Sequence, residues 1–145
     1  MPLRARCAVC DDGTDRHARE AIRSLTASYN RAFDSGDTAA WLSTFTEDGA
    51  LVVDDDQVYT GPSELASFCD GRAGSYHHLS TDSEIELHGD SAVQRCSLLL
   101  FHTADGRATL VGTGRYVDDL VNTAQGWRFR RRAVAMTRVA TAVAS

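Results

Sequence analysis

A histidine and an aspartate stand out as a candidate acid–base pair. His77 belongs to the run 76–88, whose composition predicts one long β-strand. Alternate side chains of an unbroken strand share a face, so His77 would lie with Ile85 and Leu87 and point toward the core or a pocket. His78 would then point toward solvent, and a single bulge would reverse this assignment. The alternative is that His77 is an ordinary hydrogen-bonded core histidine.

Asp34 is the candidate partner of this histidine. It lies near the C-terminal end of a predicted helix, where the helix macrodipole disfavours a carboxylate. A buried carboxylate also needs a cationic or hydrogen-bonding partner. His77 would meet this need, with Asp34 orienting the imidazole and stabilising its charged form. The alternative is that Asp34 forms a local turn with Ser35 and Gly36.

Two further side chains extend the candidate site. Tyr29 lies on the same predicted helix as Asp34, and its hydroxyl could donate to a carbonyl or a developing oxyanion, although core packing is the commoner fate of such a tyrosine. In the last predicted strand the apolar alternation changes phase between Phe129 and Val134, which indicates a bulge. Arg132 shares the parity of Val134 and is expected to turn inward. For the surrounding arginine cluster a solvated strand edge is the alternative.

Other chemical signals are weak. A lone Cys7-x-x-Cys10 pair lacks the two further ligands that a zinc site needs. The run 112–114 lacks the third glycine and the helix of a dinucleotide-binding fingerprint. The chain contains no lysine, which excludes a lysine Schiff base. We therefore expect no metal and no cofactor.

Composition bounds the class of protein. A chain of 145 residues with 43% hydrophobic and 24% charged residues suits one globular domain. The net charge of −5 argues against binding to nucleic acid or anionic lipid. No apolar run approaches the ~20 residues of a membrane span, and the N-terminus does not resemble a secretory signal, so we expect a cytoplasmic protein. We expect tails at 1–14 and 140–145 around a domain at 15–139.

The predicted elements order themselves as helices followed by strands. A helix begins at Asp15, a short one carrying Trp41 and Phe45 follows, and Pro62 opens a third. Four long β segments come after Gly74. This order predicts an α+β fold in which a curved antiparallel sheet wraps over three helices and encloses a cavity.

These pieces together resemble the SnoaL-like members of the nuclear transport factor 2-like superfamily. The resemblance rests on Phe33-Asp34-Ser35-Gly36-Asp37, on His77-His78-Leu79-Ser80-Thr81 and on their spacing within roughly 15–138. The other matching pieces are 41–50, 59–62, 89–92, 114–118 and 126–132. The family implies a cone-shaped α+β barrel with an apolar pocket and a homodimer formed through the sheet.

The resemblance also implies a function. Members such as scytalone dehydratase, bile acid 7α-dehydratase and hexachlorocyclohexane dehydrochlorinase are similar in using a histidine paired with an aspartate. By that likeness His77 and Asp34 are the dyad and Tyr29 assists. The expected substrate-binding residues are Arg132, Trp41, Phe33, Val53, Leu79, Val134 and Met136.

The expected function is therefore a cofactor-independent lyase or isomerase, a dehydratase or cyclase. Its substrate would be a small apolar, polyketide-, steroid- or terpenoid-like molecule, with His77 as the general base. The alternative is a binding module that holds such a ligand in the same pocket without turning it over.

Overall fold

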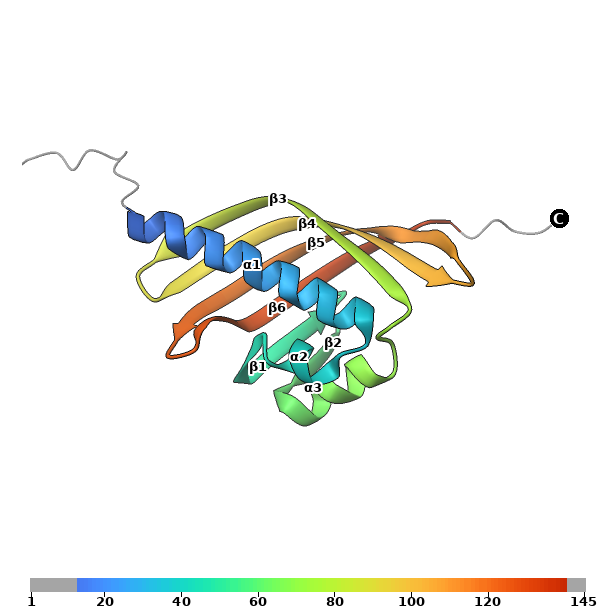
Figure 1. Ribbon diagram of the computed structural model, residues 1–145, viewed down its shortest axis with the longest axis horizontal. Helices are drawn as coiled ribbons and strands as arrows, with labels where there is room; N and C mark the ends of the chain where they lie inside the picture. The colour runs from blue at the N-terminus through green and yellow to red at the C-terminus, as the bar shows by residue number, and fades with distance from the viewer. Residues whose placement is uncertain (1–12, 141–145) are drawn as a thin grey trace, which may run out of the picture.

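The computed structural model describes residues 13–140, and its helices and strands follow the predicted order (Figure 1). The expectations for Cys7 and Cys10 and for most of the two tails lie outside these residues. The elements are α1 Gly13–Ser35, α2 Thr38–Leu42, β1 Phe45–Val53, β2 Gln57–Thr60, α3 Gly61–Asp70, β3 Tyr76–His88, β4 Ser91–Ala104, β5 Arg107–Thr123 and β6 Gly126–Arg138.

Local signals explain where the helices begin and end. The apolar stripe of α1 is buried, and the helix ends before Gly36, whose φ of 77° favours glycine. Asp37 caps α2 by accepting a hydrogen bond from the backbone N–H of Ala40 at 3.0 Å. Phe45, expected on the second helix, instead begins β1.

One six-stranded sheet carries the fold, in the order β2-β1-β6-β5-β4-β3. The α+β class is confirmed, but the sheet is mixed, because β1 pairs parallel with β6 while the other pairs are antiparallel. The sheet also remains open, since β2 and β3 are its two edges. The curved sheet wraps around α1, while α2 and α3 lie beside β1 and β2 (Figure 1).

The bulge expected in the last strand is present. Leu120 pairs with Phe129 and Asp119 pairs with Arg131, so Arg130 is an extra residue on β6. Side chains before this bulge and after it can therefore both reach the core from the same strand. This shift turns Arg132 inward, where it is fully buried.

A second bulge interrupts β3, where an unbroken strand was expected. Thr81 pairs with Ser97, but Glu84 pairs with Arg95, so β3 contains one residue more than β4 over this interval. Asp82 has a φ of 55°, a left-handed conformation that aspartate tolerates better than most residues. The bulge reverses the faces of the two halves of the strand.

The core lies between α1 and the sheet and is built largely from aromatic rings. Tyr29 alone contacts four of them, at centroid separations of 5.4 to 6.3 Å. The buried aromatic residues are Tyr29, Phe33, Trp41, Phe45, Tyr116, Trp127 and Phe129.

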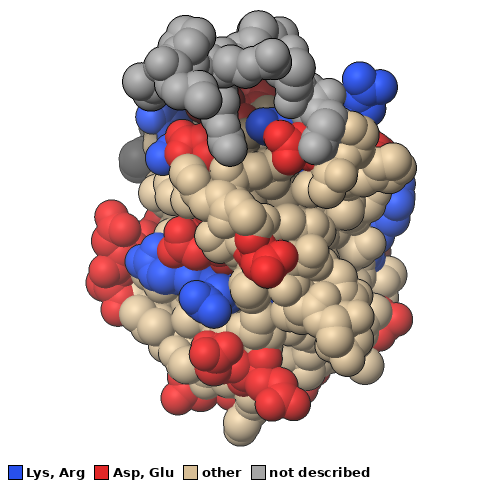
Figure 2. Space-filling model, turned by 90° about the vertical axis from the view of Figure 1, so that its left-hand side faces the viewer, with Lys and Arg blue, Asp and Glu red and all other residues tan. Residues whose placement is uncertain are grey.

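None of the helices within 13–140 is both long and apolar enough to cross a membrane. Acidic groups are scattered over the end of the molecule where α1 begins (Figure 2).

Candidate functional site

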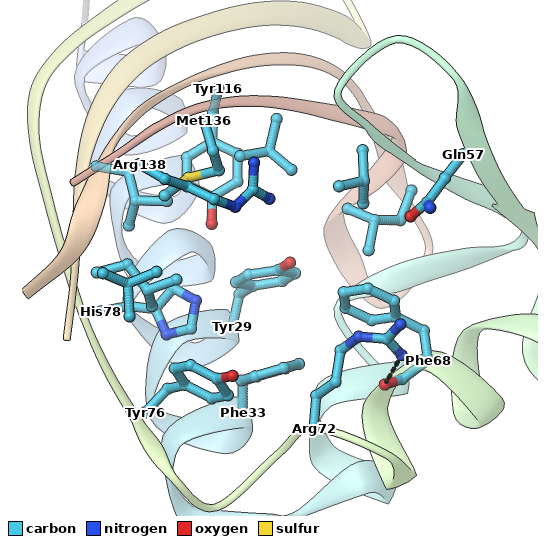
Figure 3. A pocket seen from close by; sticks show the side chains of 16 residues that line it. Tyr29, Phe33, Gln57, Phe68, Arg72, Tyr76, His78, Tyr116, Met136 and Arg138 are labelled. Atoms are coloured by element: carbon cyan, nitrogen blue, oxygen red, sulfur yellow. Dashed lines mark hydrogen bonds between the residues drawn. The ribbon is translucent and has the colours of Figure 1, made fainter. Parts of the chain in front are cut away.

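A cavity of about 300 Å³ lies between α1, the inner face of the sheet and α3. Its walls are largely apolar, and its polar groups are three tyrosines, one histidine, one glutamine and two arginines (Figure 3). The lining residues are Tyr29, Phe33, Leu51, Val53, Gln57, Phe68, Arg72, Tyr76, His78, Leu98, Leu100, Val111, Tyr116, Val134, Met136 and Arg138. A volume of this size suits a small organic molecule.

The histidine that faces this cavity is His78, and the orientation expected for His77 is wrong. The His77 side chain is 59% exposed, whereas that of His78 is 8% exposed. The bulge between Thr81 and Glu84 is the reason, because the parity counted from Ile85 does not extend past it. A signal was available in the sequence: the residues from Thr81 to Glu84 are all polar and break the alternation.

Asp34 holds His78 through two hydrogen bonds. The Nδ1 atom of His78 lies 2.6 Å from Oδ1 of Asp34, and the backbone N–H of His78 donates to Oδ2 at 2.9 Å. This N–H is available because β3 is an edge strand of the sheet. The His77 Nδ1 atom lies farther away, at 3.8 Å from Oδ2. Both oxygens of Asp34 are therefore engaged by His78.

This arrangement assigns different roles to the two ring nitrogens of His78. With its Nδ1–H donating to Asp34, the neutral imidazole has its lone pair on Nε2. Within 13–140 no protein group hydrogen-bonds to Nε2, and the ring lines the cavity. The Phe33 ring packs edge-on against the imidazole, with 5.2 Å between the ring centres, and restricts its rotation. The geometry fits a proton acceptor whose orientation is set by a carboxylate.

Tyr29 and Tyr116 supply hydroxyls to the inner wall of the cavity. Both are nearly inaccessible to solvent, at 3% and 2% exposure. Burial raises the pKa of Tyr29 to about 12, against the opposing effect of the nearby Arg132 charge. Burial likewise raises the pKa of Tyr116 well above its ordinary value. Both phenols therefore remain protonated hydrogen-bond donors at neutral pH.

The raised pKa of Tyr29 predicts a specific spectroscopic result. At about pH 10, where an ordinary tyrosine is half ionised, the difference in phenolate absorbance between wild type and Tyr29→Phe should be close to zero. The difference should appear only near pH 12. Alkaline absorbance titration of the two proteins measures this. A phenolate difference already present near pH 10 would contradict the assignment.

Arg132 lies behind the two tyrosines and does not line the cavity. Its guanidinium carbon sits 3.5 Å from the ring centre of Tyr116 and 4.3 Å from that of Tyr29. Its Nε is 3.1 Å from Oδ1 of Asp118, and both side chains are fully buried. Gln94 donates to the other oxygen of Asp118 at 2.9 Å. Arg132 is thus part of a buried ion pair beneath the site, and the expected direct place in the pocket is wrong.

Of the other residues expected to bind substrate, some line the cavity and others do not. Phe33, Val53, Val134 and Met136 line the cavity, as expected. Trp41 is completely buried in the core and does not line the cavity. Leu79 is 46% exposed on the outer face of the sheet, because it shares the parity of His77. The lining residues that the sequence did not single out include His78, Phe68, Arg72, Tyr76, Tyr116 and Arg138.

The described part of the chain contains no candidate metal site. Within 13–140 no group of three or more His, Cys, Asp and Glu side chains is placed to hold a metal ion. Cys69 and Cys96 are buried there as free thiols. Burial raises the pKa of the Cys96 thiol to about 11, which disfavours the reactive thiolate.

Comparisons with known proteins agree with this architecture. A variant of Rv3472, a Mycobacterium tuberculosis protein of unknown function, is 29% identical, with 88% of this chain and 78% of that chain covered and a TM-score of 0.79. A nuclear transport factor 2-like protein with a cystatin-like fold from Novosphingobium aromaticivorans is 27% identical, with 92% and 95% covered and a TM-score of 0.77.

A further likeness concerns the fold alone. A Novosphingobium aromaticivorans protein provisionally described as a scytalone dehydratase is 20% identical, with 91% and 93% covered and a TM-score of 0.78. No curated protein sequence matches the chain. The model of the SnoaL-like domain family matches residues 14–133. The chain therefore belongs to the SnoaL-like domain family, within the nuclear transport factor 2-like superfamily.

Proposed function

We propose that the protein is a cofactor-independent lyase or isomerase that transfers a proton on a small, largely apolar molecule. The observation that carries this proposal is the 2.6 Å contact between His78 and Asp34 on the wall of an apolar cavity. His78 replaces His77 as the general base of the mechanism. Polyketide-, steroid- and terpenoid-like ketones are the substrates that such a cavity suits.

The proposed reaction is dehydration or a related enolisation. Nε2 of His78 takes a proton from the carbon beside a carbonyl, the C–H electron pair forms a double bond to the carbonyl carbon, and the carbonyl π pair moves onto the oxygen. Asp34 stabilises the imidazolium that results. The phenol of Tyr29 donates to the carbonyl oxygen as negative charge develops. In a β-hydroxyketone the carbonyl then re-forms, the double bond moves between the α- and β-carbons as the C–OH bond breaks, and the proton on His78 leaves with the hydroxide as water.

Proton exchange into a simple ketone tests this function without knowledge of the substrate. 1-Tetralone carries acidic protons beside its carbonyl, and their replacement by deuterium in D₂O is visible by proton NMR. We expect the wild-type protein to accelerate this exchange above the buffer rate. Binding of 1-tetralone without accelerated exchange would instead favour a module that only holds its ligand.

A homodimer through the outer face of the sheet is the second part of the proposal. Leu79 and Val117 are 46% and 44% exposed, and the strand registers place both on the face opposite the helices. Covering these two exposed apolar side chains would favour the association of two chains.

Sedimentation velocity tests the dimer. We expect wild type to sediment as a dimer and Val117→Arg as a monomer, because the new charge would be buried at the interface. The matched control is Val58→Arg, which alters a residue that is 56% exposed on the edge strand β2 and should leave the dimer intact. A monomeric wild type would contradict this part of the proposal.

A further inference from the structure

The cavity that holds His78 also receives two guanidinium groups. Arg72 follows the end of α3 and Arg138 is the last residue of β6, and both are exposed residues that line the cavity. Figure 3 shows their side chains reaching into it from opposite sides. None of the cavity-lining residues in the described part of the chain carries a carboxylate. Asp54 pairs with Arg138 beside the cavity, so among residues 13–140 it is Arg72 that brings an unpaired positive charge to this opening.

Arg72 is held in place with most of its donors unused. One nitrogen, NH1, donates to the backbone carbonyl of Phe68 at 3.2 Å, and the guanidinium carbon lies 4.4 Å from the centre of the Phe68 ring (Figure 3). Among residues 13–140 it forms no ion pair. A guanidinium has five N–H donors, so the others remain available to a ligand. Phe68 thus orients a cation at the cavity without neutralising it.

The positive charge of Arg138 is partly neutralised by an ion pair with Asp54. Its NH1 and NH2 donate to Oδ2 of Asp54 at 3.1 and 3.0 Å. The other oxygen of Asp54 accepts a hydrogen bond from the backbone N–H of Met136 at 2.8 Å, which fixes the carboxylate beside the arginine. Asp54 therefore positions Arg138 and also competes with any anion that would bind it.

We propose that the ligand of this cavity is an organic anion, whose carboxylate binds between Arg72 and Arg138 while its apolar body extends toward His78. The proposal rests on the function proposed above for the identity of the reacting end, and it adds the chemical class of the substrate. Charge-assisted hydrogen bonds to guanidinium groups are stronger than neutral ones and fix orientation. Anchoring the acid at the opening would present the other end of the molecule to the imidazole.

A matched pair of probes tests the charge preference. Naphthalene-2-carboxylate and naphthalene-2-carboxamide have nearly the same shape and differ in charge, and calorimetry measures the affinity of each. We expect wild type to bind the carboxylate about tenfold more tightly than the amide. Arg72→Met should remove most of that preference and leave amide binding within about twofold. The control Arg31→Met changes an exposed arginine of α1 outside the cavity and should alter neither affinity.

Asp54→Asn should change carboxylate affinity in the opposite direction to Arg72→Met. Asparagine tolerates the left-handed backbone at this position, where φ is 52°, and its amide oxygen can still accept from Met136. Removing the competing negative charge should raise carboxylate affinity about threefold without changing amide affinity. Unchanged or weaker carboxylate binding in this variant would count against Arg138 as part of the anion site.

The outcome separates this inference from the proposed function. His78→Ala should retain the preference for carboxylate, so loss of exchange chemistry and loss of anion binding are distinct results. Equal affinities of wild type for the acid and the amide, or no binding of the acid at millimolar concentration, would overturn the anion proposal. A preserved preference in a wild type that exchanges no protons would leave the anion site standing and refute only the catalytic function.

Discussion

Replacing His78 by alanine is expected to lower deuterium exchange into 1-tetralone by about 10²- to 10⁴-fold, the usual contribution of a positioned general base. The reason is that His78 presents Nε2 to the cavity while Asp34 holds its Nδ1 at 2.6 Å. The measurement is the initial exchange rate by proton NMR at saturating ketone. The folded state is checked independently by binding of naphthalene-2-carboxylate.

His77 offers the matched control, because it is the adjacent residue of the same type on the same strand. Its side chain is 59% exposed and lies outside the cavity lining. His77→Ala should therefore keep the exchange rate within about twofold, as is usual for exposed substitutions. The reverse result, with His77→Ala inactive and His78→Ala active, would refute the assignment of the base.

Asp34→Asn tests the carboxylate separately. Asp34 accepts two hydrogen bonds from His78, one from the ring and one from the backbone. An asparagine has only one acceptor oxygen, so one of these donors would lose its partner and the imidazolium would lose its countercharge. We expect this variant to exchange more slowly than His77→Ala by a factor of at least about ten.

Replacing Arg132 by methionine is expected to lower the free energy of unfolding by about 3–5 kcal/mol. The substitution leaves the fully buried Asp118 without its cation, 3.1 Å away in the wild type. It also removes the guanidinium that packs on the rings of Tyr29 and Tyr116. In a domain of this size the melting temperature should fall by roughly 10 °C, as measured by calorimetry.

The deficit of this variant should depend on pH in a defined direction. Burial already raises the pKa of Asp118, and Arg132 opposes that rise. Without Arg132 the carboxyl would take up a proton more readily, and the protonated form costs less to bury. A buried acid with a raised pKa destabilises the folded state as pH increases through that pKa. The stability deficit should therefore be smaller at about pH 5 than at about pH 7.

Two further variants make the stability test decisive. Arg131→Met alters the adjacent, exposed arginine and should change the free energy of unfolding by less than about 0.5 kcal/mol. Replacing both members of the pair, with Arg132→Met and Asp118→Leu, should recover part of the loss because no buried charge remains. A single Arg132→Met variant as stable as wild type would show that the ion pair contributes nothing to folding.

The class of fold and most of the element boundaries were predictable from local patterns. The apolar stripe of α1, the cap at Asp37 and the turns between the strands are short-range signals. They determined the order of elements and the placement of Asp34 near the end of α1. The bulge beside Arg130 was also predictable, because apolar residues on both sides of it reveal the change of phase.

Tertiary structure decided which of the two adjacent histidines, His77 or His78, points to the inner face of the sheet. The bulge in β3 lies in the all-polar run from Thr81 to Glu84, which interrupts the alternation without showing how many residues are extra; the register against β4 shows that there is one. That one residue exchanges His77 for His78 as the partner of Asp34 and moves Leu79 to the outer face.

Contacts between distant segments decided the rest of the site. Arg72, at the end of α3, and Arg138, at the end of the chain's last strand, meet at one cavity only because β6 pairs parallel with β1 beside α3. Arg132 and Asp118 meet on neighbouring strands beneath Tyr29 of α1. The sequence by itself determined the order and class of the elements, because those depend on local periodicity, and its resemblance to SnoaL-like proteins indicated the family and Asp34 as a carboxylate of the site. Which side chains surround the cavity depends on strand register and long-range pairing, which only the folded chain establishes.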